Sequence, residues 1–188
     1  GINNAFYMSA MSLVLAGMSF YTKYTLELSG LETTIMFAVV LLIAVVSIGI
    51  WAGQVRRLGL FPIWRGSILL LVAGFLSLHF ATGLISAILC CILIGLAYGG
   101  ILATMDLLGA RVVDEDKAVS GMRREGIISN ALGFLNRLNG LFVSLGWFIM
   151  ERSFGFISGE RPGPQPGAAS RFLTATFPMI MMIFCFFS

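Results

Sequence analysis

The chain has 188 residues, of which 58% are hydrophobic and only 11% are charged, and its formal net charge is +3. Soluble domains have about 45–50% apolar and about 25% charged residues, so this composition excludes a water-soluble enzyme and predicts an integral membrane protein. The few basic residues are scattered at the ends of apolar segments instead of forming a patch, which excludes a nucleic-acid binder.

Six apolar segments come close to the roughly 20 residues that a helix needs to cross a bilayer. In chain order they cover about residues 4–21, 34–52, 66–80, 84–108, 126–150 and 172–188. The third is short and reaches a comfortable length only by including residues 81–83. None of these runs alternates apolar and polar residues as the strands of a membrane barrel do. We therefore predict an all-α integral membrane protein with six transmembrane helices.

Basic residues near the membrane ends predict the direction of these helices, because cytoplasmic loops carry an excess of Lys and Arg. Seven lie on one side: Arg56, Arg57, Arg65, Arg111, Lys117, Arg123 and Arg124. Four lie on the other: Lys23, Arg152, Arg161 and Arg171. We expect a multi-pass protein of the plasma membrane with the first side, and both ends of this chain, in the cytoplasm.

The connections between the predicted helices differ in kind. Residues 151–170 are rich in Pro and Gly, which is typical of a flexible loop, and residues 79–83 form a tight turn. Residues 111–125 are the only long charged stretch, and we interpret them as an inner loop. Three spans, a tight turn and three more spans fit an inverted repeat of residues 1–83 and 84–188. Because the chain starts at Gly1 in mid-pattern, we expect it to be part of a longer protein.

The fifth predicted helix has a polar face. Its members are spaced by three or four residues and so share one side of the helix: Asn130, Gly133, Arg137, Gly140 and Ser144. Asn136 borders this face. An arginine inside the membrane is costly unless it is solvated or paired. Either Arg137 forms a structural ion pair or reaches the membrane surface, or it faces a water-filled cavity and contacts a substrate or a gating partner; its small and amide neighbours favour the cavity.

Two other helices have weaker candidates. Tyr7 on the first span and Tyr98 on the fourth offer flat rings with a hydroxyl that could stack on a solute, although tyrosines near span ends are often interfacial. Asp106 near the inner end of the fourth span is either an inner-gate acid or a residue that reaches the interface. Pairs of glycines four residues apart indicate close helix packing on the second and fourth spans: Gly49 with Gly53 and Gly95 with Gly99.

The sequence gives no sign of catalysis. Cys90, Cys91 and Cys185 all fall inside apolar runs, without the spacing of a metal site or a disulfide framework. No nucleophile–base pair, zinc motif or phosphate-binding glycine loop is evident. We therefore predict that the protein is not an enzyme and has no catalytic residue, metal or cofactor.

One stretch carries a resemblance. Residues 110–137, ARVVDEDKAVSGMRREGIISNALGFLNR, are similar to the glycoside–pentoside–hexuronide:cation symporter family (melibiose permease-like) of the major facilitator superfamily. In that family Ala-Asp-x-x-Asp ends the tenth helix, Arg-x-Glu opens the eleventh, and a Lys follows twelve residues after the Glu. The second acid is Asp114 here, Arg-x-Glu is residues 123–125, and Arg137 takes the Lys position. Arg111 replaces the family's first Asp, and Arg137 exchanges a point charge for a planar fork.

The resemblance implies the C-terminal half, helices seven to twelve, of a secondary transporter that works by alternating access. It implies symport of a sugar or glycoside with a sodium ion or proton, which would bind mainly in an N-terminal half outside this sequence. The expected partners are therefore a small solute, the coupling cation, the N-terminal half and the lipid bilayer. The candidate substrate-binding residues are Arg137, Asn130, Asn136, Gly133, Tyr7 and Tyr98. The candidate inner gate consists of Asp114, Glu115, Asp116, Arg123, Arg124, Glu125, Arg56, Arg57 and Asp106.

Three alternatives stay open. The charged stretch could be a solvated loop that only sets topology. The same fold could carry a lipid, a lysolipid or another organic solute, because one cation in a wide apolar cleft would suit such cargo. The six helices could also form a half-size membrane scaffold that transports nothing.

Overall fold

The computed structural model describes residues 2–120, 125–155 and 163–187, and every regular element in these ranges is helical. Six helical segments are long and apolar enough to cross a membrane, which confirms the predicted fold class. The elements are α1 (Ile2–Tyr24), α2 (Gly30–Leu58), α3 (Leu60–His79), α4 (Leu84–Ser120), α5 (Glu125–Phe154), α6 (Pro166–Arg171), the π-turn η1 (Phe172–Thr176) and α7 (Phe177–Phe187).

The junction between α2 and α3 is shorter than the sequence suggested. Gly59, at a φ of 89° that favours glycine, separates the two helices by itself. Pro62 follows in the first turn of α3, where the missing backbone N–H costs no hydrogen bond. The expectation that the third span starts at Gly66 and gains its length from residues 81–83 is therefore wrong. The helix is longer than expected at its N-terminal end, where it begins at Leu60, and it ends at His79.

The charged stretch at the end of α4 is helical as well. The prediction that residues 111–125 form a loop is wrong for residues 111–120, which continue α4 without interruption. Arg111 Nε lies 3.0 Å from Glu115 Oε1, one helical turn away, and such pairs support a helix in water. Hydropathy marks where a span stops being apolar, and a helix can continue beyond that point where side-chain pairs four residues apart support it.

The predicted loop over residues 151–170 is also shortened, from both sides. Helix α5 continues to Phe154, and α6 begins at Pro166, a residue whose fixed φ suits the first helical position. Residues 156–162 lie outside the described part of the chain.

The last span contains a π-turn with a clear cause. Pro178 has no backbone N–H to donate to the carbonyl of Thr174, and its ring would crowd that carbonyl in a regular α-helix. Over residues 172–176 the pairing is widened by one residue, so that the Phe177 N–H bonds to the Phe172 carbonyl. The span crosses this point without breaking, as α6, η1 and α7 in succession.

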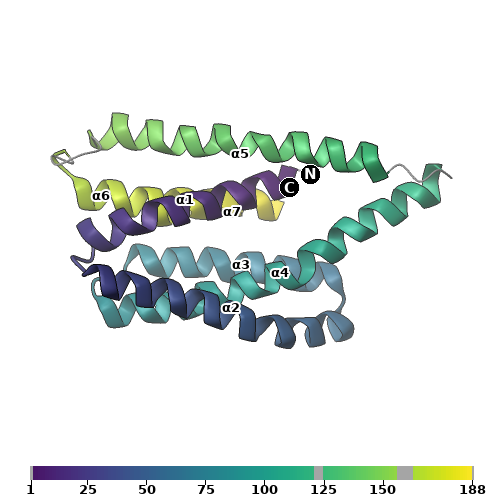
Figure 1. The fold of residues 1–188 in the computed structure, drawn as a ribbon, viewed down its shortest axis with the longest axis horizontal. Helices are drawn as coiled ribbons and strands as arrows, with labels where there is room; N and C mark the ends of the chain where they lie inside the picture. Colours follow the sequence, from purple (N-terminus) through teal and green to yellow (C-terminus); the bar gives the residue numbers. More distant parts are fainter. Residues whose placement is uncertain (1, 121–124, 156–162, 188) are drawn as a thin grey trace.

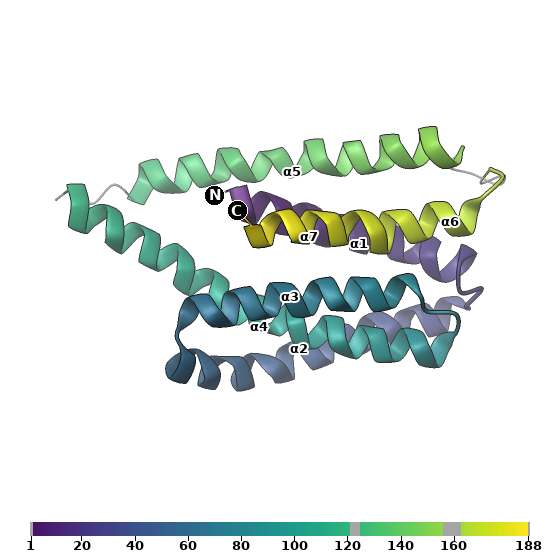
Figure 2. The same cartoon turned by 180° about the vertical axis from the view of Figure 1, so that it is seen from behind.

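The helices form two groups (Figures 1 and 2). Helix α4 packs against α2 and α3, whereas α1 packs against α5 and the α6–α7 span. Contacts of α3 with η1 and α7 join the groups. Both ends of the chain lie side by side at one end of the bundle, which we call the terminus end, and the connections from α1 to α2 and from α3 to α4 lie at the other, the turn end.

Hydrogen bonds tie the turn end together. Tyr21 Oη donates to the Leu78 carbonyl at 2.6 Å and so joins α1 to α3. Thr25 Oγ1 donates to the Gly167 carbonyl at 2.9 Å and joins α1 to α6. His79 Nδ1 lies 3.1 Å from Thr176 Oγ1, so its ring has a partner inside the bundle. These contacts fix the ends of α1, α3 and the last span against one another.

Candidate functional site

The polar face of α5 lies on the outside of the described bundle. All five of its members are exposed: Asn130, Gly133, Arg137, Gly140 and Ser144. A side-chain carbon added at Gly133 or Gly140 would meet no atom within 4 Å. Within residues 2–120, 125–155 and 163–187, no hydrogen bond or ion pair is found for Arg137. Arg137 is the thirteenth residue of the 30 in α5, close to the middle of the span.

The other side of α5 packs against α1. The rings of Phe142 and Phe6 are 5.1 Å apart between centroids, and those of Trp147 and Phe20 are 5.8 Å apart. Gly146 lets this face approach the bundle, since a carbon added there would lie 3.2 Å from Leu13 and from Phe177. The polar face of α5 therefore points away from α1, because the aromatic face on the other side of α5 packs against α1.

Two side-chain amides of α5 belong to this packed side. Asn4 Nδ2 donates to Asn136 Oδ1 at 2.6 Å, and Asn139 Nδ2 donates to Ser12 Oγ at 3.2 Å. Consecutive residues of a helix are about 100° apart, so Asn136 faces α1 while Arg137 faces outward. The structure therefore does not bring Asn136 together with Arg137, Asn130 and Gly133 as one group.

The two tyrosines form a separate contact between α1 and α4. Tyr7 is only 2% exposed, and its ring stacks on Tyr98 with 6.4 Å between centroids. Tyr98 is partly exposed. The structure thus places Tyr7 and Tyr98 side by side, with Tyr7 inside the bundle.

Helix α4 approaches α2 through glycines. A side-chain carbon at Gly95 would lie 2.7 Å from the Val40 carbonyl oxygen, and one at Gly99 would lie 2.6 Å from that of Ala44. The indole of Trp51 on α2 donates to the Leu96 carbonyl at 2.8 Å. The predicted packing role of the α4 glycines is confirmed. A carbon at Gly49 or Gly53 would meet nothing within 4 Å, so this pair is not used inside the described bundle.

The candidate gate residues that the structure describes lie near the terminus end, on α4, α2 and the start of α5. Asp114 and Glu115 are exposed on the end of α4, Asp116 is half-buried there, and Arg56 and Arg57 are exposed in the last turn of α2. Arg123 and Arg124 lie outside the described residues, and Glu125 is the first residue of α5.

Sequence reasoning missed the role of Arg111 in this region. Its Nε pairs with Glu115, and its guanidinium lies 4.9 Å from the centroid of the Phe61 ring on α3. The spacing of four residues between Arg111 and Glu115 was the signal that could have identified the pair. Arg111 therefore links the charged end of α4 to the start of α3.

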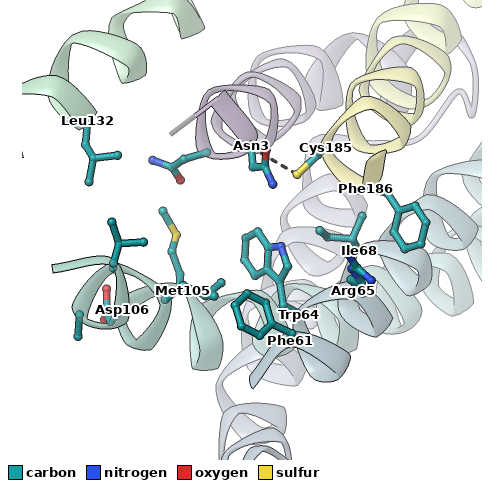
Figure 3. A pocket seen from close by; sticks show the side chains of 15 residues that line it. Asn3, Phe61, Trp64, Arg65, Ile68, Met105, Asp106, Leu132, Cys185 and Phe186 are labelled. Atoms are coloured by element: carbon teal, nitrogen blue, oxygen red, sulfur yellow. Dashed lines mark hydrogen bonds between the residues drawn. The ribbon is translucent and has the colours of Figure 1, made fainter. Parts of the chain in front are cut away.

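A cavity of about 670 Å³ opens at the terminus end, between α1, α3, α4, α5 and α7 (Figure 3). Asp106 lies on its α4 wall and Arg65 on its α3 wall, with the rings of Phe61, Trp64 and Phe186 nearby. Asn4 and Leu132 complete the side formed by α1 and α5. Asp106 is exposed and lines the edge of this cavity, ahead of the charged end of α4. No sequence motif predicted this cavity, because its walls come from five different helices.

The described residues contain no cluster of His, Cys, Asp or Glu that could hold a metal ion. Cys90, Cys91 and Cys185 are buried free thiols. Cys185 donates to the Asn3 carbonyl at 3.4 Å and so helps to hold α7 against the start of α1.

Comparison with known proteins gives one family. The family described as MFS/sugar transport protein matches residues 4–188, which is nearly the whole chain. No curated protein and no solved structure gives a significant match.

Proposed function

Since the chain belongs to the MFS/sugar transport protein family of the major facilitator superfamily, we propose that it forms the C-terminal half of a cation-coupled sugar or glycoside symporter. It is a multi-pass membrane protein and a transporter of the major facilitator type. What we propose beyond this is the class of solute, the coupling cation, the position of the chain in the C-terminal half of the fold, and the solute site.

The exposure of Arg137 is the main observation that supports a solute site on the polar face of α5. An arginine in mid-span that faced lipid would cost from about 2.5 to more than 10 kcal/mol. Its described surroundings offer no partner, and the glycines beside it leave open space. The polar face of α5 must therefore meet water or other protein atoms. A water-filled solute pathway between this half and an N-terminal half meets that need.

Within this pathway Arg137 and Asn130 would be the direct contacts. The planar guanidinium offers several N–H donors in a fixed fork, which suits the neighbouring hydroxyl oxygens of a sugar. The amide of Asn130 can both donate and accept, and Gly133 lies between them on the same face with room for a ring. Asn136 would act indirectly, because its hydrogen bond with Asn4 joins α5 to α1, and the stacked rings of Tyr7 and the partly exposed Tyr98 join α1 to α4.

The contacts among the helices support an inverted repeat of residues 1–83 and 84–188. Exchanging α1 with α4, α2 with α5 and α3 with the last span turns the α2–α4 contact into the α1–α5 contact. The same exchange turns the α3–α4 contact into the one between α1 and the last span, and each of these contacts is present. Such repeats are common in transporters that alternate access around a central site.

We also propose that the protein lies in the plasma membrane with the terminus end in the cytoplasm, and the excess of basic residues at that end supports this orientation. The gate would then be an inner one, where Asp114, Glu115 and Asp116 pair with basic residues when the cytoplasmic side is closed. The coupling cation, a sodium ion or proton, would bind mainly in the N-terminal half.

Uptake by the full-length transporter in vesicles tests this proposal. Radiolabelled sugars and glycosides are offered with and without an inward sodium or proton gradient, and we expect gradient-dependent uptake. Arg137→Ala should lower uptake about 10- to 100-fold, because a hydrogen bond to a charged group contributes about 1.5–3 kcal/mol. Arg137→Lys should retain part of the activity.

Arg152→Ala is the matched control, because Arg152 lies in the last turn of the same helix, against the ring of Phe148. It should transport like the original protein. Uptake at the same rate with and without either gradient would contradict the proposed cation coupling. Equal losses of uptake in Arg137→Ala and Arg152→Ala would contradict the proposed solute site.

A further inference from the structure

The cavity at the terminus end is separate from the proposed solute face. It touches α5 at Leu132, whereas the solute face centres on Arg137 five residues later. Five residues turn a helix by about 140° beyond a full turn and advance it by about 7.5 Å. The cavity and the solute face therefore lie on different sides of α5.

The depth of the cavity is that of the membrane interface. Arg65 is the sixth residue of α3, and Asp106 is followed by the charged end of α4, so both lie near the ends of apolar stretches. Phe61, which is exposed, and Trp64, which is buried in the core, stand beside Arg65 at the start of α3. A volume of about 670 Å³ is in the range of small-molecule sites, which is too small for another helix.

The charges on the cavity walls are complementary to a zwitterion. Asp106 and Arg65 are both exposed and lie on opposite sides of the cavity mouth (Figure 3), and neither forms an ion pair or a hydrogen bond within the described part of the chain. Asn4 Oδ1 is buried beside the cavity and has no hydrogen-bond donor among the described residues. The cavity thus offers two acceptors, one on α4 and one on α1, and a guanidinium on α3.

An apolar route leads from the cavity to the surface. Phe61 is 50% exposed and Val112 is 49% exposed, and both belong to the cavity wall. Leu107, beside Asp106 on α4, is also exposed. Acyl chains could lie along these residues while a polar headgroup fills the cavity.

We propose that this cavity binds the headgroup of a zwitterionic phospholipid with a primary ammonium group, of the phosphatidylethanolamine type. Arg65 receives the phosphate, as basic pockets between membrane helices do. Asp106 and Asn4 Oδ1 accept hydrogen bonds from the ammonium. A trimethylammonium has no N–H to donate, so these two acceptors favour the primary amine.

Native mass spectrometry of the purified full-length protein tests the proposal without any transport assay, so its failure is distinguishable from a failure of the proposed function. The delipidated protein is titrated with phosphatidylethanolamine, phosphatidylcholine and phosphatidylglycerol. We expect phosphatidylethanolamine to bind about tenfold more tightly than phosphatidylcholine, the size of effect that a lost hydrogen bond to a charged group produces. Asp106→Asn should abolish this preference, and Arg65→Ala should weaken all three lipids.

Lys117→Ala is the matched control, because Lys117 is exposed near the same end and does not line the cavity. It should bind lipid like the original protein. If the first two variants fail to fold, Ala110→Trp gives a second test, since Ala110 is exposed and lines the cavity, which the indole would fill.

Three results would overturn the proposal: equal affinity for the three lipids, unchanged lipid binding in Asp106→Asn and Ala110→Trp, or binding of free phosphoethanolamine as tight as that of the whole lipid. The last result would make the cavity a site for a soluble zwitterion.

Discussion

The α2–α4 and α1–α5 contacts are equivalent in the proposed repeat, yet they are built from different chemistry. Helix α4 approaches the backbone of α2 at Gly95 and Gly99, at distances where no side chain fits. Helix α5 meets α1 through rings and amides, and a carbon added at Gly146 would face side-chain atoms at 3.2 Å. Backbone cannot move aside without moving a helix, whereas side chains can change rotamer.

The difference indicates which pair can change during a transport cycle. A contact made of backbone and glycine has one favourable geometry, so we expect α2 and α4 to move together. A contact made of amides and aromatic rings can exchange partners, so α5 can shift relative to α1. The polar face of α5 is thus on the more adjustable helix, where small movements change the space beside Arg137.

The largest expected effect comes from filling the glycine contact. Gly99→Ala should lower the stability of the purified protein by about 1–3 kcal/mol, because overpacking forces the backbones apart. Gly49→Ala is the matched control on α2, where the added carbon meets nothing within 4 Å. It should leave the stability equal or raise it by up to about 1 kcal/mol through better helix propensity. Thermal unfolding in detergent measures both, and equal melting temperatures for the two variants would contradict a rigid α2–α4 contact.

A smaller effect is expected for the amide contact. The hydrogen bond between Asn4 and Asn136 should contribute only about 0.6 kcal/mol, the average for polar contacts between membrane helices. A double-mutant cycle with Asn4→Leu and Asn136→Leu isolates this coupling from the loss of each side chain. A coupling energy as large as the loss in Gly99→Ala would show that α1 and α5 are held as firmly as α2 and α4.

The smallest effect concerns the end of α4, beyond its contact with α2. Asp114→Ala should shift the balance between inward- and outward-facing states by less than about fivefold, because one exposed ion pair contributes about 0–1 kcal/mol. Labelling of a cysteine introduced beside the cytoplasmic pathway measures the shift in the full-length transporter. Lys23→Ala, at the turn end, should leave the labelling rate unchanged. The gate assignment fails if Asp114→Ala and Lys23→Ala label at the same rate.

The sequence predicted the polar face of α5 correctly as one side of one helix. Helical spacing alone grouped Asn130 with Arg137, and the structure leaves both exposed. Helical spacing did not show that Asn136 faces α1, because the tertiary structure decides which helix packs against which side of α5. The bond from Asn4 to Asn136 spans 132 residues, and no local pattern indicates it.

The number of membrane spans was determined by the sequence itself, since burying about 20 apolar residues in lipid is a local property of each segment. Helix ends were not determined in this way, because α4 continues through charged residues that water tolerates, and α3 starts directly after the single glycine that ends α2. The tertiary structure alone decided the cavity between Asp106 and Arg65. Its walls belong to five helices that are distant in the chain, and only their packing determines which charges share one space.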